Sequence, residues 1–408
     1  MISKSDFQHL SETFSGPEGR YNYFPRITGW KNNLDLKTWF ESLEKYQGNE
    51  IDLYIHIPFC ERFCHFCGCN IKVAAKNDII ENYLSKLANE WALYERYNFK
   101  IKSLYFGGGT PNSLTSTQLE RLLDTLPGNY SIHSEYDPRY KNFDFINTLM
   151  SRGLKSISMG IQDFDETVLA SIGRRTDFLT VEENLKYFKS LNLEKISIDL
   201  IYGLPRQGES SLTKLEEFLK LDLISNISLY PFAEVPWFKD FYPAWSNEKF
   251  SIAQKNELQF NFIEKLSEYG FAPISFGHFT NDKNQLMKQE RTIMGFNKEC
   301  EDIVIALGVS AISSTPENIK QNTKIFDHYM IDIQGQITGH IRSNKEARLQ
   351  ELLLNLSANK EVSSDNFQIP RALFELDLLK SNDATVSLSE NGRYFCQYIC
   401  GAIVNENN

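Results

Sequence analysis

Residues 54–70 read Tyr54-Ile55-His56-Ile57-Pro58-Phe59-Cys60-Glu61-Arg62-Phe63-Cys64-His65-Phe66-Cys67-Gly68-Cys69-Asn70. Three of the cysteines, Cys60, Cys64 and Cys67, have the spacing C-x3-C-x2-C. An apolar run typical of a β-strand precedes them and ends at Pro58, so we expect the thiols on a loop that leaves a strand. Gly68 permits that loop to turn tightly, because glycine adopts backbone conformations that other residues avoid.

This spacing favours an iron–sulfur cluster. Thiolates are soft ligands for such clusters and for zinc. Three of them on one loop can hold three corners of a [4Fe–4S] cluster and leave the fourth iron for a non-protein ligand. A structural zinc ion would need four ligands, and Cys69 could complete that set. A disulfide is disfavoured because the chain has an intracellular character. We expect Cys300, Cys396 and Cys400 to be buried and inert.

Length and composition predict a cytoplasmic enzyme. The 408 residues suffice for a large catalytic domain and a smaller one, and 41% hydrophobic with 24% charged residues is near the globular average. The net charge of −10 does not favour non-specific binding of nucleic acid. The N-terminus lacks a signal-peptide core, and no apolar run approaches the ~20 residues of a membrane span.

Strand-like runs alternate with helical stretches along the first 230 residues. Such alternation predicts an α/β fold built from parallel βα units. The expected strands are Leu53–Ile57, Ser103–Phe106, Ser131–Glu135, Ser156–Ile161, Ile196–Ile201 and Ile227–Tyr230. The expected helices are Ile79–Tyr97, Thr117–Leu126, Phe143–Ser151, Val181–Leu191 and Ser211–Leu221. In such sheets, ligands bind at the carboxyl ends of the strands.

The unusual residues fall at these ends. Gly107-Gly108-Gly109-Thr110-Pro111 follows the second expected strand, Glu135 ends the third, and Gln162, Asp199 and Ala233 follow or end later strands. These features also have interpretations without a ligand. The glycines could form an ordinary turn, Glu135 could be a solvated carboxylate, and Asp199 could form a structural ion pair with Arg174. A carboxylate that ends an apolar run is costly to bury without partners, so we expect Asp199 to bind a ligand or to form an ion pair.

These motifs resemble the radical S-adenosylmethionine (SAM) superfamily, whose cluster motif is C-x3-C-x2-C. The wider string from Tyr54 to Asn70 resembles the oxygen-independent coproporphyrinogen III oxidases. The resemblance extends to Arg20, Tyr21, Tyr23 and Pro25, to the triple glycine, and to residues 308–313, Gly-Val-Ser-Ala-Ile-Ser. It implies a partial (β/α)6 TIM-like barrel at residues 51–315, with an N-terminal extension at 1–50. Residues 316–408 would form a helical, winged-helix-like cap that serves as a lid.

The resemblance implies a [4Fe–4S] cluster on Cys60, Cys64 and Cys67, and two SAM molecules. In the family, the first SAM contacts the residues equivalent to the triple glycine, Glu135 and Ile312. The second SAM contacts those equivalent to Gln162, Arg174, Asp199 and Ala233. The full set of candidate cofactor-binding residues is Tyr54, Phe66, Gly108, Gly109, Thr110, Glu135, Gln162, Arg174, Asp199, Ala233 and Ile312.

The activity implied is reductive cleavage of SAM, followed by oxidative decarboxylation of two propionates of coproporphyrinogen III to vinyl groups, giving protoporphyrinogen IX. An electron donor such as flavodoxin or ferredoxin would serve a monomeric enzyme. The substrate carboxylates need cations, for which the candidates are Arg20, Arg26, Arg175 and Arg291.

Two departures leave other functions open. The family's Gln-Gly-Tyr-Thr is Met294-Gly295-Phe296-Asn297 here, and its Asp-His-Phe is Gly277-His278-Phe279. One alternative is a related two-SAM enzyme, a methyltransferase or cyclopropanase. Another is a haem-trafficking protein of the same family, although that group usually has Phe where this chain has Cys69.

Overall fold

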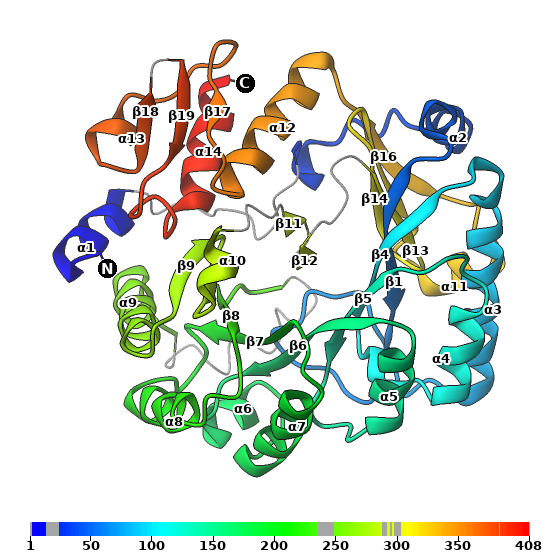
Figure 1. Ribbon diagram of the computed structural model, residues 1–408, viewed down its shortest axis with the longest axis horizontal. Helices are drawn as coiled ribbons and strands as arrows, with labels where there is room; N and C mark the ends of the chain where they lie inside the picture. Colours follow the sequence, from blue (N-terminus) through cyan, green and yellow to red (C-terminus); the bar gives the residue numbers. More distant parts are fainter. Residues whose placement is uncertain are drawn as a thin grey trace.

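The computed structural model describes residues 2–13, 24–235, 249–287, 292–293, 296–297, 303–382 and 384–407. Within these residues, a 12-stranded sheet curves through the molecule (Figure 1). Its strands follow the order β16 (Ile337–Ile341), β15 (Asn318–Asn322), β14 (Ile312–Ser314), β13 (Val304–Leu307), β1 (Glu50–Ile57), β4 (Lys100–Gly108), β5 (Ser131–Tyr136), β6 (Leu154–Gln162), β7 (Lys195–Tyr202), β8 (Asn226–Pro231), β10 (His278–Thr280) and β9 (Ala272–Ser275).

The strands from β1 to β8 confirm the predicted parallel units. Each of the six expected strands is present, and each pairs in parallel with the next in the order β1, β4, β5, β6, β7, β8. The apolar run before Gly308 adds β13, which the sequence did not predict as a strand. It pairs in parallel with β1, with Asp52 opposite Val304.

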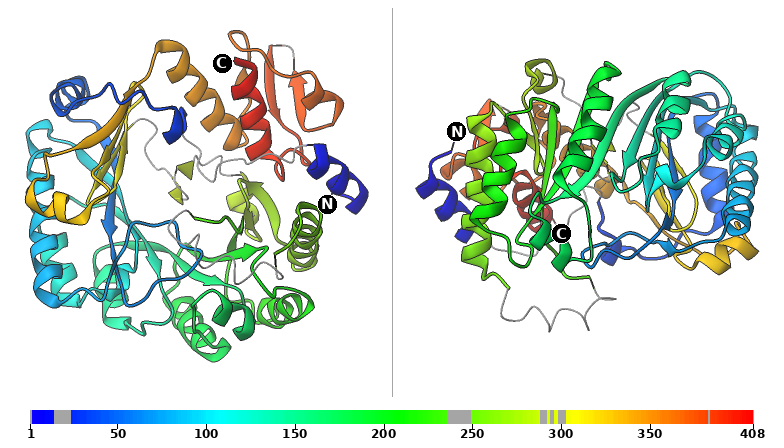
Figure 2. Two further views of the ribbon diagram at one scale, coloured as in Figure 1. Left: turned by 180° about the vertical axis from the view of Figure 1, so that it is seen from behind. Right: turned by 90° about the horizontal axis from the view of Figure 1, so that it is seen from below.

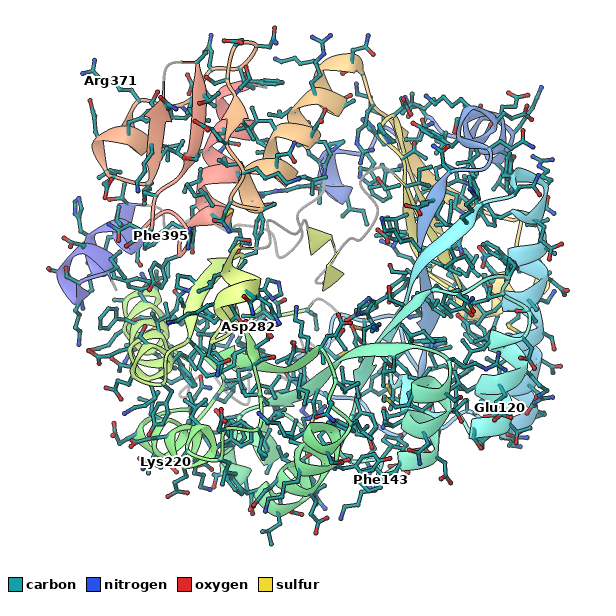
Figure 3. All side chains as sticks on the ribbon, viewed as in Figure 1. Glu120, Phe143, Lys220, Asp282, Arg371 and Phe395 are labelled. Carbon is teal, nitrogen blue, oxygen red and sulfur yellow. The ribbon has the colours of Figure 1, made fainter. Side chains whose placement is uncertain are left out.

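Helices cover the outer face of the parallel strands (Figures 1 and 2). They are α3 (Asn77–Ala92), α4 (Ser116–Leu123), α5 (Phe143–Ser151), α6 (Glu166–Ser171), α7 (Phe178–Ser190) and α8 (Glu209–Leu219). Only the short α6 was not predicted. In α4, a capping box between Thr115 and Gln118 starts the helix, Leu119 and Leu122 are buried, and Glu120 faces outward (Figure 3). The hydrophobic core therefore lies between sheet and helices.

Among the described residues, the sheet does not close into a full barrel, since β16 and β9 are its two edges. Antiparallel strands flank the parallel ones at both edges: β14, β15 and β16 on one side, β10 and β9 on the other. The architecture is thus the expected α/β partial barrel. The division of the chain at residues 50 and 315 stays a prediction, and the strands of the main sheet continue to Ile341.

Gly277 lies in a tight turn. The strand-like stretch from Ile274 to Phe279 is divided between β9 and β10, which form a hairpin. Both Phe276 and Gly277 have positive φ, 50° and 78°. A Cβ on Gly277 would lie 2.5 Å from the carbonyl oxygen of Leu229. The departure from the family's Asp at this position therefore has a local cause, because the turn and the close approach both require glycine.

A smaller unit follows the main sheet. In the described part of the chain it contains α12 (Asn344–Ser357), α13 (Ala372–Glu375), α14 (Cys396–Asn407) and a sheet of β17 (Val362–Ser363), β19 (Thr385–Leu388) and β18 (Leu379–Asn382). β18 and β19 form an antiparallel hairpin, with Leu379 opposite Leu388. The N-terminal helix α1 (Lys4–Thr13) joins this unit to α9 (Ile252–Glu268): the Phe7 ring lies 5.2 Å from Phe395 and 5.5 Å from Phe260.

The remaining elements are short. They are α2 (Leu36–Leu43), β2 (Phe59–Cys60), β3 (Lys72–Val73), α10 (Lys283–Met287), β11 (Thr292–Ile293), β12 (Phe296–Asn297) and α11 (Phe326–Ile331). Among the described residues, no helix combines the length and apolar character needed to cross a membrane.

Candidate active site

A cavity lies at the carboxyl ends of β4, β5, β6 and β7, where the fold predicts a ligand. Its walls bring the cysteine loop together with the polar residues that end these strands. Of the candidate site residues, the cavity is lined by Cys60, Cys64, Cys67, Phe66, Gly108, Gly109, Thr110, Glu135, Gln162, Arg174 and Asp199. Residues from distant parts of the sequence thus share one site.

Three candidates lie elsewhere in the described structure. Ala233 is exposed, shortly after β8. Ile312 and Tyr54 both pack against the small apolar cluster that contains Trp30 and Ile319. The Tyr54 side chain also borders Gly107, since a Cβ on that glycine would lie 3.0 Å from the Tyr54 hydroxyl and 3.1 Å from Glu135 Oε1.

Main-chain contacts hold the cysteine loop. Cys60 lies in β2, which pairs in parallel with β3. A turn between Cys64 and Cys67 closes through a 3.0 Å hydrogen bond from the Cys67 amide to the Cys64 carbonyl. Cys64 is buried, Cys60 and Cys67 are half-buried, and Cys69 is exposed. Burial raises the pKa of Cys60 to about 12, so this thiol keeps its proton until a metal displaces it.

The loop fits a [4Fe–4S] cluster. Among the described residues, no three His, Cys, Asp or Glu side chains converge as ligands of a single metal ion. A four-iron cluster does not need its ligands to converge on one ion, because each thiolate binds its own corner iron. Cys60, Cys64 and Cys67 line one cavity together, as binding of such a cluster requires.

The triple glycine lets β4 approach the cysteine loop. Gly108 has a φ of 114°, and a Cβ there would lie 2.7 Å from the His56 ring. A Cβ on Gly109 would lie 2.8 Å from the backbone of Pro58 and 3.0 Å from Cys60 Sγ. The sequence predicted these glycines for close approach to a ligand. The structure adds a second reason, which is contact with the strand and loop that carry the cysteines.

His56 connects β1 to the end of the cysteine loop. Its Nε2 lies 2.8 Å from the carbonyl oxygen of Asn70, and its Nδ1 lies 3.1 Å from the Tyr54 hydroxyl. Burial lowers the pKa of His56 to about 4, so the ring is neutral near pH 7. A neutral ring donates one hydrogen bond, to the Asn70 carbonyl, and accepts the other from Tyr54.

Glu135 lies at the cavity wall as predicted. Its Oε2 accepts a 3.1 Å hydrogen bond from the Gly108 amide, and the side chain is half-buried. The carboxylate is therefore partly withdrawn from water and held beside the glycine run. Gln162 lies on the neighbouring β6 with a φ of 78°, at an irregularity in the pairing with β7. Such strain in a non-glycine residue is concentrated at functional sites.

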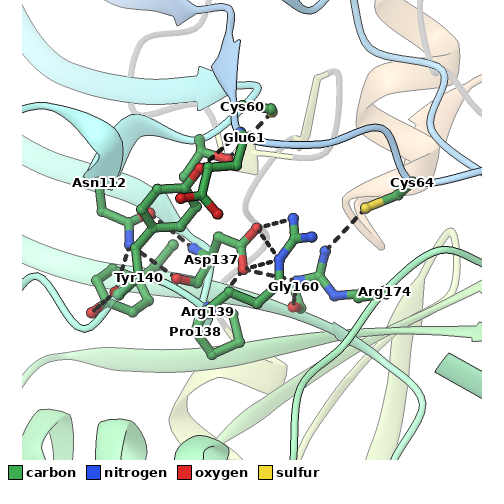
Figure 4. A network of polar contacts seen from close by, with 12 residues as sticks. Cys60, Glu61, Cys64, Asn112, Asp137, Pro138, Arg139, Tyr140, Gly160 and Arg174 are labelled. Atoms are coloured by element: carbon green, nitrogen blue, oxygen red, sulfur yellow. Dashed lines mark hydrogen bonds and ion pairs between the residues drawn. The ribbon is translucent and has the colours of Figure 1, made fainter. Parts of the chain in front are cut away.

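Arg174 and Asp199 do not form the ion pair that was considered as an alternative. Arg174 Nη2 lies 3.3 Å from Asp137 Oδ1 and also donates to the Gly160 carbonyl (Figure 4). Asp199 Oδ1 accepts a 3.2 Å hydrogen bond from Ser158. The Arg174 side chain is buried, yet its Nε has no hydrogen-bond partner among the described residues.

Asp137 and Arg139 were missed as site residues, although both line the cavity. The signal was a run of charges, Glu135-Tyr136-Asp137-Pro138-Arg139, directly after a buried strand. Burial alone would raise the pKa of Asp137, but the charges of Arg174 and Arg139 and their hydrogen bonds hold it below the ordinary value. Asp137 is therefore ionised.

Of the predicted substrate cations, the two that the structure describes do not line the cavity. Arg26 and Arg175 are exposed, and neither lines it. Arg20 and Arg291 lie outside the described residues, as do Tyr21, Tyr23, Met294, Gly295 and Cys300. The guanidinium groups that line the cavity belong instead to Arg62, Arg139 and Arg174. Cys396 and Cys400 are buried in α14, as expected.

Comparison with known proteins identifies the class. Residues 54–219 match the family model described as the radical SAM superfamily. This match identifies a radical SAM domain in residues 54–219, the part of the chain that contains the cysteine motif. Radical SAM proteins use a [4Fe–4S] cluster and SAM, which is the pair of cofactors that the site was expected to hold.

Individual relatives indicate which kind of radical SAM protein this chain resembles. The chain is 28% identical to the oxygen-independent coproporphyrinogen III oxidase of Helicobacter pylori, over 96% of this chain and 92% of that protein. It is 28% identical to the protein of the same name from Escherichia coli, over 79% of this chain and 74% of that protein. A solved structure of coproporphyrinogen III oxidase from Escherichia coli has the same fold, with a TM-score of 0.86, 24% identity, and coverage of 94% of this chain and 96% of that one.

Proposed function

We propose that this protein is an oxygen-independent coproporphyrinogen III oxidase, which acts in anaerobic porphyrin biosynthesis. Two propionates of coproporphyrinogen III each lose one hydrogen atom, carbon dioxide and one electron, and the product is protoporphyrinogen IX. The observation that carries the proposal is the cavity in which the C-x3-C-x2-C thiols meet Glu135, Gln162, Arg174 and Asp199. Similarity over 96% of the chain to a relative of that name supports the choice of substrate.

The chain's own residues would hold the cofactors. Cys60, Cys64 and Cys67 would bind the cluster, and Glu135 with the adjacent glycines would bind the SAM at its open iron. When bound, the cluster and SAM supply one-electron reductive cleavage and abstraction of a hydrogen atom.

A second SAM would lie against Gln162, Arg174 and Asp199. The buried Arg174 guanidinium, at the wall of this cavity, is the cation that favours a carboxylate ligand there. Tyr54, Ala233 and Ile312 do not line this cavity, and the cofactor contacts that the resemblance implies for them stay a prediction.

The decisive test is anaerobic incubation with coproporphyrinogen III, SAM and a reductant, followed by mass spectrometry. Loss of carbon dioxide and two hydrogens per propionate is the expected result, with two such losses in the final product. Gain of a methyl or methylene group would instead indicate a methyltransferase or cyclopropanase. Bound haem without formation of 5′-deoxyadenosine would indicate a trafficking protein.

The cluster assignment has its own test. Protein reconstituted anaerobically should contain about four irons with matching acid-labile sulfide. Replacing Cys60, Cys64 or Cys67 with alanine should abolish both, whereas Cys69→Ala, in the exposed cysteine of the same loop, serves as the matched control and should keep them. One zinc and no sulfide after anaerobic purification would refute the assignment.

Three further elements belong to the proposal. We infer a cytoplasmic location, because a reducing compartment keeps the motif cysteines as free thiols. A small electron carrier such as flavodoxin or ferredoxin would deliver the electron to the cluster. The enzyme would act as a monomer, with neither nucleic acid nor a membrane as a partner.

A further inference from the structure

Two arginines share one buried carboxylate at the cavity wall. Arg139 Nε lies 3.0 Å from both carboxylate oxygens of Asp137, its Nη2 donates to Oδ2, and its amide donates to Oδ1 at 3.0 Å. Arg174 Nη2 lies 3.3 Å from the same Oδ1. We call Asp137, Arg139 and Arg174 the arginine clamp. Its two cations and one anion give it a net charge of +1.

The clamp is largely buried, and its central carboxylate sits on an anchored backbone. Relative exposure is 9% for the Asp137 side chain, 5% for Arg174 and 16% for Arg139. The backbone of Asp137 is fixed independently of its carboxylate, because the Asn112 side chain accepts from the Asp137 amide at 2.9 Å and donates to its carbonyl at 3.0 Å. The charge therefore has a defined position and little access to solvent.

The clamp also faces the cluster cysteines (Figure 4). Arg174 Nη1 lies 3.7 Å from Cys64 Sγ, within hydrogen-bond distance for sulfur. Arg139 interacts electrostatically with Cys64 and Cys60, and Asp137 interacts with Cys60. Two thiols of the motif thus lie in the field of the clamp, and one receives a direct N–H donor.

Charges and donors beside an iron–sulfur cluster set its reduction potential. Reduction adds one negative charge, so a nearby positive charge or an N–H bond to a thiolate favours the reduced form. The effect is largest where solvent screening is weak.

We propose that the arginine clamp tunes the reduction potential of the cluster, with Asp137 and Arg139 as positioning residues that hold a net positive charge against Cys60 and Cys64. The inference rests on the proposed [4Fe–4S] site and deepens it. The clamp makes the cluster easier to reduce, and Asp137 limits this effect by cancelling one of the two cations.

The sign of the shift separates this role from a structural one. Arg139→Gln removes a positive charge, and Asp137→Asn removes a negative charge, from the same contact. An electrostatic clamp requires opposite shifts in these two variants. If the clamp only fixes the cavity wall, the two variants lose the same contacts. The reduction potential would then shift in the same direction in both variants, or in neither.

The experiment is a redox titration of the reconstituted cluster without SAM, monitored by electron paramagnetic resonance. At a fixed potential, Arg139→Gln should have a tenfold lower ratio of reduced to oxidised cluster than the parent, equivalent to about 59 mV for a one-electron couple. Asp137→Asn should have a ratio at least threefold higher. Arg139→Lys, which keeps the charge, and Arg175→Gln, an exposed arginine next in sequence to the clamp, should stay within threefold.

Iron and sulfide contents are measured first and must match the parent. Shifts of the same sign, or no shift in either variant, overturn the inference. If Arg139→Gln loses its cluster, the test rests on Asp137→Asn alone. A ratio of reduced to oxidised cluster in Asp137→Asn that equals or is below that of the parent then overturns the inference. A parent protein that forms no cluster refutes the proposed site, whereas a cluster whose potential does not respond to the clamp refutes only this inference.

Discussion

Replacing Gly108 with alanine should destabilise the protein by about 2–5 kcal/mol, the sum of two separate costs. The backbone φ of Gly108 is 114°, and an L-residue forced to positive φ costs roughly 1–2 kcal/mol. The new Cβ would also lie 2.7 Å from two atoms of the His56 ring. Overpacking of this kind costs about 1–3 kcal/mol.

The His56 ring cannot move aside without a further loss. Both of its nitrogens are hydrogen-bonded, one to Tyr54 and the other to the Asn70 carbonyl. Each such hydrogen bond contributes about 1 kcal/mol to stability. Rotation of the ring would relieve the overlap with the new Cβ but would break these hydrogen bonds. Displacement would also shift Asn70, which ends the cysteine loop, and we therefore expect lower iron incorporation in the variant.

The assay is urea denaturation of the anaerobically purified protein, with two matched glycines as controls. Gly48 has a φ of 78° and no atom within 4 Å of the position that a Cβ would take, so Gly48→Ala measures backbone strain alone. Gly208 has extended backbone and equally open space, so Gly208→Ala should change little. Gly108→Ala should exceed Gly48→Ala by the overlap cost of about 1–3 kcal/mol. Equal effects of these two variants would refute the argument from contact with His56.

The other predictions concern two carboxylates and the half-buried His278. Glu135→Gln should lower conversion of SAM to 5′-deoxyadenosine at unchanged iron content, through loss of a charge-assisted contact; unchanged turnover would contradict that role. Asp199→Asn should abolish product but keep the cluster and the melting temperature, because Arg174 pairs with Asp137; a lower melting temperature with normal turnover would point to a structural role. Burial, helped by Lys195, lowers the pKa of His278 to about 3. The folded state therefore binds fewer protons than the unfolded one below pH 6.5, and stability should fall by up to about 1.4 kcal/mol per pH unit as the pH decreases. Urea denaturation at pH 7 and pH 5 should show a smaller loss for His278→Gln than for the parent, with exposed His9→Gln as control.

The regular part of the fold was predictable because it follows local rules. Each parallel strand is an apolar run, each covering helix has its own periodicity, and the expected strands lie within the observed ones. The apolar run of β13 has the same composition as buried core, so sequence alone could not assign it to the sheet. The Phe276–Gly277 turn interrupts a strand-like run, and only its positive φ values reveal the hairpin.

The site was predictable in its residues but not in its pairings. Strand ends identified Glu135, Asp199 and the glycines, because parallel strands bring these ends to one edge. The partner of Arg174 depends on how a loop between two helices folds back over β5. Asp137 lies 37 residues from Arg174, and no periodicity connects them. Long-range ion pairs of this kind require the three-dimensional structure.

Contacts within the protein hold the cysteine loop at several points. Its first end is paired to β3, its middle is bound through a 2.9 Å hydrogen bond from the His65 amide to the Ile172 carbonyl, and its last end meets His56. The His56 carbonyl in turn accepts from Tyr83 of α3 at 2.8 Å. The same contacts fix the thiols relative to the arginine clamp, so the geometry on which its electrostatic effect depends belongs to the protein and not to the cluster.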